Sequence, residues 1–246
     1  MKSWHFLMSL MTFFLVISCN NGSKFEMVFV EGGDFYIGST DTDADSDEQS
    51  IRFVKIEDFY IGKYEVTQAE WTEIMKKNPS VFKNEQSPVE CVSWEDAQLF
   101  VQRLNKKTGR HFRLPTMEEW EYAAQGGTKK KKNRYSGSNI LDNVGWSLNN
   151  SGETTHHVGL LEPNDLGLFD MTGNVHEWCN GMFDSTYYIE DTIMSSLYDY
   201  SDIRVFKGGS WASLAKHCRV SNNNYNCSGF RNFTIGLRLA EDVKSY

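Results

Sequence analysis

The sequence predicts one α+β domain that is rich in loops and turns. Three segments carry helix start signals, and most of the other apolar runs are short and bounded by glycine. Nineteen glycines and seven tryptophans in 246 residues favour short strands around an aromatic core rather than a helical bundle. Since no repeat or interdomain linker interrupts the chain, we expect a single domain over residues 25–242.

The N-terminal residues have the pattern of an export signal. Lys2 gives a short basic region, and residues 6–17 form an apolar run shorter than the roughly 20 residues that span a bilayer. The sequence Val16-Ile17-Ser18-Cys19 that follows is similar to a bacterial lipobox. It predicts a signal peptide over residues 1–18, then lipidated Cys19 and a polar tether over residues 19–24. An ordinary signal peptide with an incidental cysteine is the alternative.

Short strands are expected next. Residues 27–38 predict two strands around a Gly-Gly turn, and residues 51–65 predict another strand pair. The acidic residues 41–48 between them begin like an EF-hand loop, but Ser46 and Arg52 stand where that loop needs glycine and glutamate. We therefore expect a solvated acidic loop.

Three helices follow. Thr67 with Glu70 and Thr116 with Glu119 form capping boxes, in which a hydroxyl and a carboxylate satisfy the first free amides of a helix. Ser93 is the expected N-cap of the helix between them, whose apolar residues recur on one face. Beyond residue 129 the chain reads as turns and short strands.

The cysteines leave several alternatives open. Besides Cys19 there are Cys91, Cys179, Cys218 and Cys227, and an oxidising compartment would permit three full disulfide pairings. Cys91 lies in an alternating apolar stretch and is expected to be a buried strand residue. Cys218 is either a structural cysteine or a reactive thiol whose pKa is lowered by its basic neighbours.

The charge of the chain excludes one class of partner. Its formal net charge is -8, whereas nucleic-acid binding requires a basic surface. We therefore expect no nucleic-acid partner.

Motifs along almost the whole mature chain show a family resemblance. They include Tyr64-Glu65-Val66-Thr67, Arg113-Leu114-Pro115-Thr116, Gly173-Asn174-Val175-His176-Glu177-Trp178, Gly208-Gly209-Ser210-Trp211 and Ile235-Gly236-Leu237-Arg238. In this order they resemble the formylglycine-generating enzyme (sulfatase-modifying factor) family, as a diverged bacterial lipoprotein member. The resemblance implies the irregular, loop-rich C-type-lectin-like fold of the sulfatase-modifying-factor type. It says less about activity, because function depends on the site rather than the fold.

The resemblance also implies a catalytic site, and the sequence departs from it. The family uses two cysteines five positions apart to hold Cu⁺; here Cys218 matches the second and Ser213 replaces the first, next to the matching Ser210. A hydroxyl is a poor ligand for Cu⁺. His176 stands where the family usually has tryptophan. A metal held jointly by His176, His217 and Cys218 is a further hypothesis, disfavoured if the adjacent pair lies in a strand.

Two calcium sites are implied by the same resemblance. The first would use Asp170, the carbonyls of Gly173 and Val175, and Glu177, because Ca²⁺ takes several hard oxygen ligands. The alternative is a tight turn in which the two carboxylates cap backbone amides. A second, weaker site would include Asn143 and the carbonyl of Val144.

Two functions are consistent with these observations. One is a lipid-anchored binding or assembly module of the bacterial envelope, whose partner is an envelope protein, a peptide or a glycan and which contacts the bilayer through Cys19. The other is an active metal-dependent oxidoreductase of the family that uses Cys218, as in formylglycine-type cysteine oxidation of protein substrates.

Overall fold

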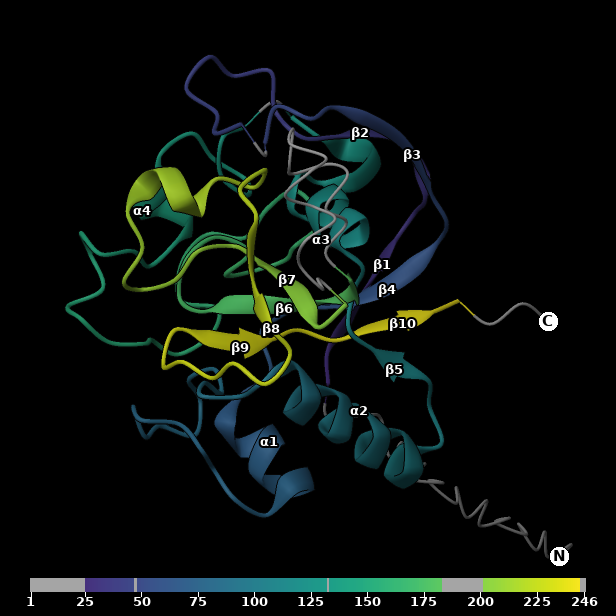
Figure 1. Ribbon diagram of the computed structural model, residues 1–246, viewed down its shortest axis with the longest axis vertical. Helices are drawn as coiled ribbons and strands as arrows, with labels where there is room; N and C mark the ends of the chain where they lie inside the picture. Colours follow the sequence, from purple (N-terminus) through teal and green to yellow (C-terminus); the bar gives the residue numbers. More distant parts are fainter. Residues whose placement is uncertain (1–24, 47, 132, 183–200, 244–246) are drawn as a thin grey trace, which may run out of the picture.

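The computed structural model describes residues 25–46, 48–131, 133–182 and 201–243 (Figure 1). The signal peptide, Cys19 and the tether lie outside these ranges. Within them, no helix is both long enough and apolar enough to cross a bilayer. The predicted α+β architecture is confirmed, with short strands, short helices and long connecting loops.

The strands form three small sheets. One has the order β1-β4-β10-β5, the second is the pair β2-β3, and the third has the order β8-β7-β6-β9 with β6 and β9 parallel. Their bounds are β1 Met27–Val30, β2 Gly33–Ile37, β3 Arg52–Ile56, β4 Phe59–Gly62, β5 Phe112–Arg113, β6 His176–Met182, β7 Ile203–Lys207, β8 Asn224–Cys227, β9 Ile235–Leu237 and β10 Ala240–Asp242.

The three predicted helices are confirmed. Thr67 and Thr116 form their capping boxes, and Ser93 forms a further one with Asp96. The helices are α1 Gln68–Met75, α2 Trp94–Thr108, α3 Met117–Ala124 and the single turn α4 Leu141–Val144, with 3₁₀ turns η1 Gly127–Lys129 and η2 Ala215–Cys218.

The expected early strands exist, but the two strands of each expected pair do not pair with each other. β1 pairs with β4, and β2 pairs with β3, so each strand of the first predicted pair joins a strand of the second. The expected strand at Cys91 is wrong, because this residue has a left-handed φ of 61° and is only partly buried.

The expectation of a fully solvated acidic loop is also wrong. Glu48 is completely buried and pairs with buried Arg219, which follows η2. Local sequence shows the acids but not this distant guanidinium, which removes much of the cost of burying a carboxylate.

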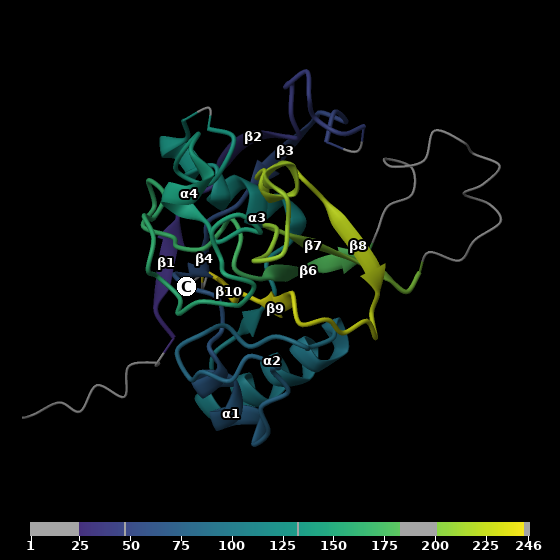
Figure 2. The same cartoon turned by 90° about the vertical axis from the view of Figure 1, so that its left-hand side faces the viewer.

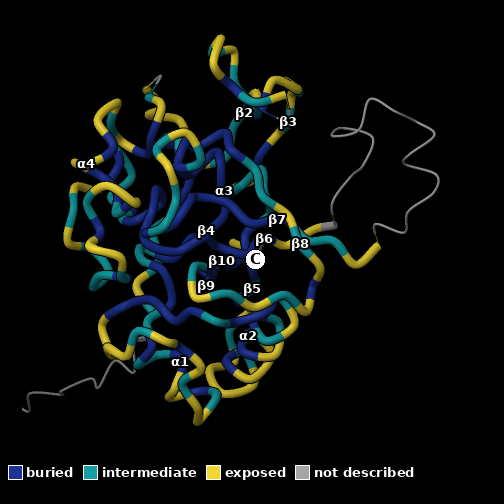
Figure 3. Tube along the Cα trace, turned by 60° about the vertical axis from the view of Figure 1, so that its left-hand side comes forward, coloured by how far each residue is buried: buried dark blue, intermediate teal, exposed yellow. Residues whose placement is uncertain are grey.

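Two apolar cores lie on either side of β6. Side chains of α1, α2 and β9 pack with Trp178 in one core, and side chains of α3 and β1 to β4 pack with Cys179 in the other. Successive strand residues face opposite sides, which explains why these neighbours enter different cores. Figure 2 shows α1 and α2 at one end of the molecule and β2 and β3 at the other. The first part of β6, residues 176–179, is buried between them, as the tube coloured by burial in Figure 3 indicates.

A buried ion pair ties these layers together. Arg238, after β9, donates to both carboxylate oxygens of Glu177 in β6 and to the carbonyls of Gly62 and Phe169. Trp120 of α3 donates its indole N–H to Oε2 of Glu177 over 2.6 Å. Both charged side chains are fully buried, so each depends on the other to avoid an isolated buried charge.

Removing the guanidinium tests this role. Arg238→Met should lower the free energy of unfolding by about 3–5 kcal/mol, because Glu177 would be left buried and unpaired. Arg231→Met is the matched control: Arg231 pairs with Asp96 at the surface, and its loss should cost below about 1 kcal/mol. Urea unfolding of both variants measures the difference; equal losses would contradict the assigned role.

Candidate functional site

A tight glycine turn begins the candidate site after β7. Gly208 and Gly209 both have left-handed φ values, of 95° and 74°. A Cβ at Gly209 would lie 2.6 Å from Sγ of Cys218, so this close approach requires glycine. The turn thereby holds the serine segment against η2.

Two serines and a histidine form a hydrogen-bonded chain beyond the turn. Ser213 Oγ accepts from the backbone N–H of Ser210 at 3.0 Å and lies 3.0 Å from Ser210 Oγ. On its other side it is 3.5 Å from Nε2 of His176. Ser213, at the position where the resemblance implies the family's first cysteine, is thus engaged with oxygen and nitrogen partners.

His176 is held as a neutral imidazole. Burial, with a smaller contribution from nearby His217, lowers its pKa to about 4. Its Nδ1 is buried without a hydrogen-bond partner among the described residues, and its ring packs edge-on against Phe206. A neutral ring in this position can hydrogen-bond to Ser213 but brings no charge to the site.

Cys218 is a buried thiol. It is fully buried in a small apolar cluster with Tyr135, Leu141 and Val144. Burial raises the pKa of its thiol to about 12, which favours the structural cysteine over the reactive thiol of the two alternatives, because little nucleophilic thiolate is then present at neutral pH. Of the disulfides considered, none joins the four described cysteines, which are all free thiols: Cys91, Cys179, Cys218 and Cys227.

The hypothesis of a metal shared by His176, His217 and Cys218 gains no support. In the described part of the chain, no three His, Cys, Asp or Glu side chains form a group that could hold a metal ion. η2 is a 3₁₀ turn rather than the strand considered from sequence, and it places Cys218 inside while His217 is only partly buried.

The first predicted calcium site contains an excess of buried carboxylates. Asp170, Glu177 and also Glu65 are buried, and Arg238 supplies the positive charge paired with Glu177. Burial raises the pKa of Asp170 to about 6, and burial with the charges of Asp170 and Glu177 raises the pKa of Glu65 well above its ordinary value. A bound cation would relieve this repulsion.

The individual ligands fit this calcium site unequally. Asp170 Oδ2 accepts from the N–H of Gly159, but Oδ1 is buried without a hydrogen-bond partner in the described structure, as expected of a free ligand atom. Both oxygens of Glu177 are instead occupied by Arg238 and Trp120. The residues therefore fit a cation at Asp170 but not at the carboxylate of Glu177.

Glu65 was missed as a site residue. Its two oxygens accept from the N–H of Val175 and the side-chain amide of Asn174, so it holds the turn that carries the expected carbonyl ligands. Its place in the Tyr64-Glu65-Val66-Thr67 motif was the available signal. The second site is less developed: the side chain of Asn143 is exposed, and the backbone carbonyl of Asn143 already accepts from the backbone N–H of Glu162.

An aromatic surface lies beside the serine pair, and we define it by Phe82, Trp211 and Phe233. Their ring centroids lie 5.3 to 6.4 Å apart, and the indole N–H of Trp211 donates to the carbonyl of Phe233. Phe233 and the nearby Leu214 are exposed. Phe82 also lines a cavity of about 460 Å³ between residues 82–87 and 154–160. Phe82 is half-buried and Trp211 is buried, so the exposed part of this aromatic surface is the ring of Phe233.

The structure is a loop-rich α+β domain in which a Gly-Gly-Ser turn packs against a buried cysteine, as the motif resemblance led us to expect. Residues 15–243 match the Sulfatase-modifying factor enzyme 1-like domain, and the chain belongs to this family. The family and fold expected from the motifs are therefore confirmed.

Known relatives have diverse names. The chain is 35% identical to Chaperone protein LppX of Paenibacillus barcinonensis, over 80% of this chain and 82% of that protein. It is 32% identical to Formylglycine-generating enzyme of Streptomyces coelicolor over 63% of this chain, and spans about half (53%) of that enzyme. Among solved structures, Treponema denticola variable protein 1 superposes with a TM-score of 0.78 and 30% identity, over 89% and 95% of the two chains.

Proposed function

We propose that this protein is a lipid-anchored binding module of the bacterial envelope that has kept the family scaffold and lost its copper chemistry. The observation that carries the proposal is the state of the two family cysteine positions. Ser213 is hydrogen-bonded to Ser210 and lies beside His176, and Cys218 is a buried, protonated thiol. Neither group is a ready thiolate ligand for Cu⁺.

The proposed location follows from the N-terminal residues and from one relative. The apolar run and lipobox-like sequence ending at Cys19 favour export and lipidation. The relative named Chaperone protein LppX matches over most of both chains and supports a role in which the domain holds another protein rather than modifying it.

We place the proposed partner, an exported protein or peptide, at the aromatic surface. Phe233 offers an exposed ring at its edge, and Trp211 is fixed beneath by its indole hydrogen bond. Large, rigid aromatic side chains next to a concave region are the usual anchors of peptide and protein binding. The cavity at Phe82 provides that concave region.

The alternative function is an active oxidoreductase that uses Cys218. The retained Gly-Gly-Ser turn and the cysteine beside it are the observations in its favour. It requires a thiolate at Cys218, which burial disfavours.

An aggregation assay tests the proposed binding. The purified domain should suppress light scattering by thermally unfolding citrate synthase, and Phe233→Ala should weaken suppression about tenfold because an anchoring ring is lost. Phe29→Ala is the matched control, since Phe29 is 47% exposed and Phe233 is 43% exposed. Absence of suppression by the unaltered domain, or equal effects of both variants, would contradict the proposal.

We further propose a structural Ca²⁺ at Asp170 and the carbonyls of Gly173 and Val175. The main observation for this proposal is that Oδ1 of Asp170 is buried without a hydrogen-bond partner in the described structure. It lies in a region with more buried carboxylates than buried positive charges. When bound, Ca²⁺ would neutralise this charge and fix the turn.

Chelation tests this ion. Because a ligand that binds only the folded state stabilises it, saturating Ca²⁺ should raise the melting temperature of chelator-treated protein by roughly 5–10 °C. Asp170→Asn should abolish the rise, while Asp165→Asn, in an exposed pair with Lys131, should preserve it. A melting temperature that does not respond to Ca²⁺ in the unaltered protein would rule the ion out.

A further inference from the structure

A second cavity lies away from the serine pair. It measures about 490 Å³ and is bordered by the β2–β3 connection, the turns after α3 and the residues that follow η2. We call it the Tyr36 pocket. Its lining includes Tyr36, Asp41, Gln125, Asn133, Arg134, Asn139 and Arg219.

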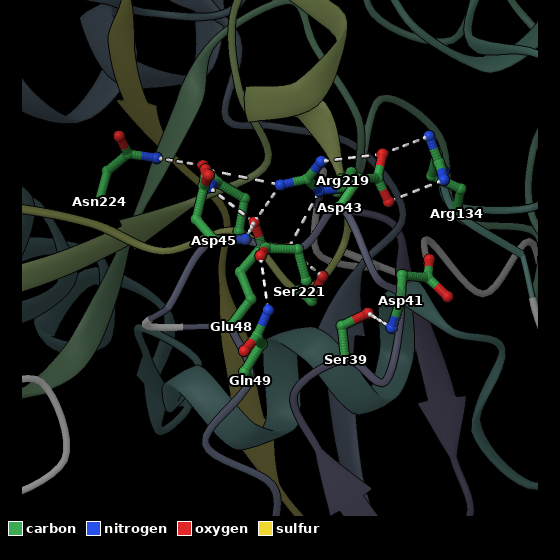
Figure 4. Close-up of polar contacts among 12 residues, drawn as sticks. Ser39, Asp41, Asp43, Asp45, Glu48, Gln49, Arg134, Arg219, Ser221 and Asn224 are labelled. Atoms are coloured by element: carbon green, nitrogen blue, oxygen red, sulfur yellow. Dashed lines mark hydrogen bonds and ion pairs between the residues drawn. The ribbon is translucent and has the colours of Figure 1, made fainter.

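Two lining residues of the Tyr36 pocket, Arg219 and Ser221, belong to a buried polar network around Glu48. Arg219 is 2% exposed and pairs with the fully buried carboxylate of Glu48, which also accepts from the hydroxyl of Ser221 (Figure 4). Burial alone would raise the pKa of Glu48, but the bonds from Arg219 and Ser221 lower it below its ordinary value. The acidic loop is thereby fixed as a wall of the cavity.

The charges around this pocket argue against an anionic ligand. Arg219 also lies within 3.7 Å of Asp43, which pairs with Arg134 at 3.1 Å, and within 3.5 Å of Asp45. Both guanidinium groups are thus already paired with carboxylates, and Asp41 adds another acid to the lining. An incoming carboxylate or phosphate would meet net negative charge.

The remaining groups suit a ligand with alternating apolar and hydroxyl-bearing faces. Tyr36 is 61% exposed, and its ring is held edge-on against Phe53 at 5.4 Å. Gln125, Asn133 and Asn139 contribute amides, and amides both donate and accept hydrogen bonds. The amide of Asn139 already accepts from the backbone N–H of Arg134 and donates to Asn133, which leaves Gln125 and the amide N–H₂ of Asn133 as the main groups for a ligand. A sugar ring presents C–H groups to an aromatic face and paired donors and acceptors at its edge.

We propose that the Tyr36 pocket binds a neutral oligosaccharide. The aromatic ring of Tyr36 stacks on one sugar, the amides bind its hydroxyls, and the Glu48–Arg219 network keeps the wall in place. The volume of the cavity is in the range of small-ligand sites and accommodates one or two sugar units. This site does not depend on the aromatic surface or on the proposed partner there.

Calorimetric titration with two neutral probes, N-acetylglucosamine tetramer and maltotetraose, tests the proposal. At least one should bind with a Kd between about 10 μM and 1 mM. Tyr36→Ala should weaken binding about tenfold or more, and Asn133→Ala should weaken it measurably. Phe29→Ala, which removes an exposed aromatic ring on β1, should leave the Kd unchanged.

Two further conditions separate a sugar from a basic peptide, which the acidic wall could also attract. Sugar binding should persist in about 0.5 M NaCl and in Asp41→Asn, because it involves no ion pair. Pentalysine binding that is lost in salt, with no binding of either sugar at about 10 mM, would overturn the proposal. So would sugar binding that Tyr36→Ala does not weaken.

Discussion

The buried pair between Glu177 and Arg238 is the interaction on which the rest of the structure depends. Its guanidinium reaches the carbonyls of Gly62 and Phe169, and its carboxylate receives the indole of Trp120. One ion pair therefore joins β6, the end of β4, α3 and the loop before the Asn174 turn. A domain with so little regular secondary structure requires such a contact, because few backbone ladders connect its parts.

The packing around the Gly208-Gly209 turn explains how residues of the candidate site can change while the fold is kept. The Gly208-Gly209 turn and Cys218 form a packing unit with Tyr135, in which a neutral thiol fills apolar space. Packing needs the size of that thiol and not its reactivity. Ser213 is satisfied by Ser210, so replacing a cysteine there leaves no unpaired group.

Sequence reasoning succeeded where the signal was local or was a family motif. Thr67, Ser93 and Thr116 cap their helices through residues three positions away, which makes these starts readable. It failed where the cause was distant. The burial of Glu48 depends on Arg219, 171 positions later, and the pairing of β1 with β4 passes over the β2–β3 hairpin. Cys91 alternates like a strand residue, yet it has a left-handed φ, and its backbone N–H donates to the carbonyl of Asn232, far along the chain.

In the candidate site, too, local motifs could be recognised from the sequence, whereas contacts between distant residues could not. The motifs identified Ser210, Ser213, Cys218 and Asp170 by position. They could not show that the oxygens of Glu177 are taken by Arg238 or that Glu65 supports the neighbouring turn. Those facts depend on which charges meet in the folded core. Binding at the aromatic surface and the loss of the copper site are therefore proposals that rest on local geometry rather than on family membership.

The most direct measurement is Cu⁺ affinity of the purified mature domain, compared among the unaltered protein, Ser213→Cys and Cys218→Ala. The account predicts no tight binding by the unaltered protein and a gain in Ser213→Cys, because two thiolates five positions apart restore a soft ligand pair. Tight binding by the unaltered protein that disappears in Cys218→Ala would contradict the account and establish a working metal site.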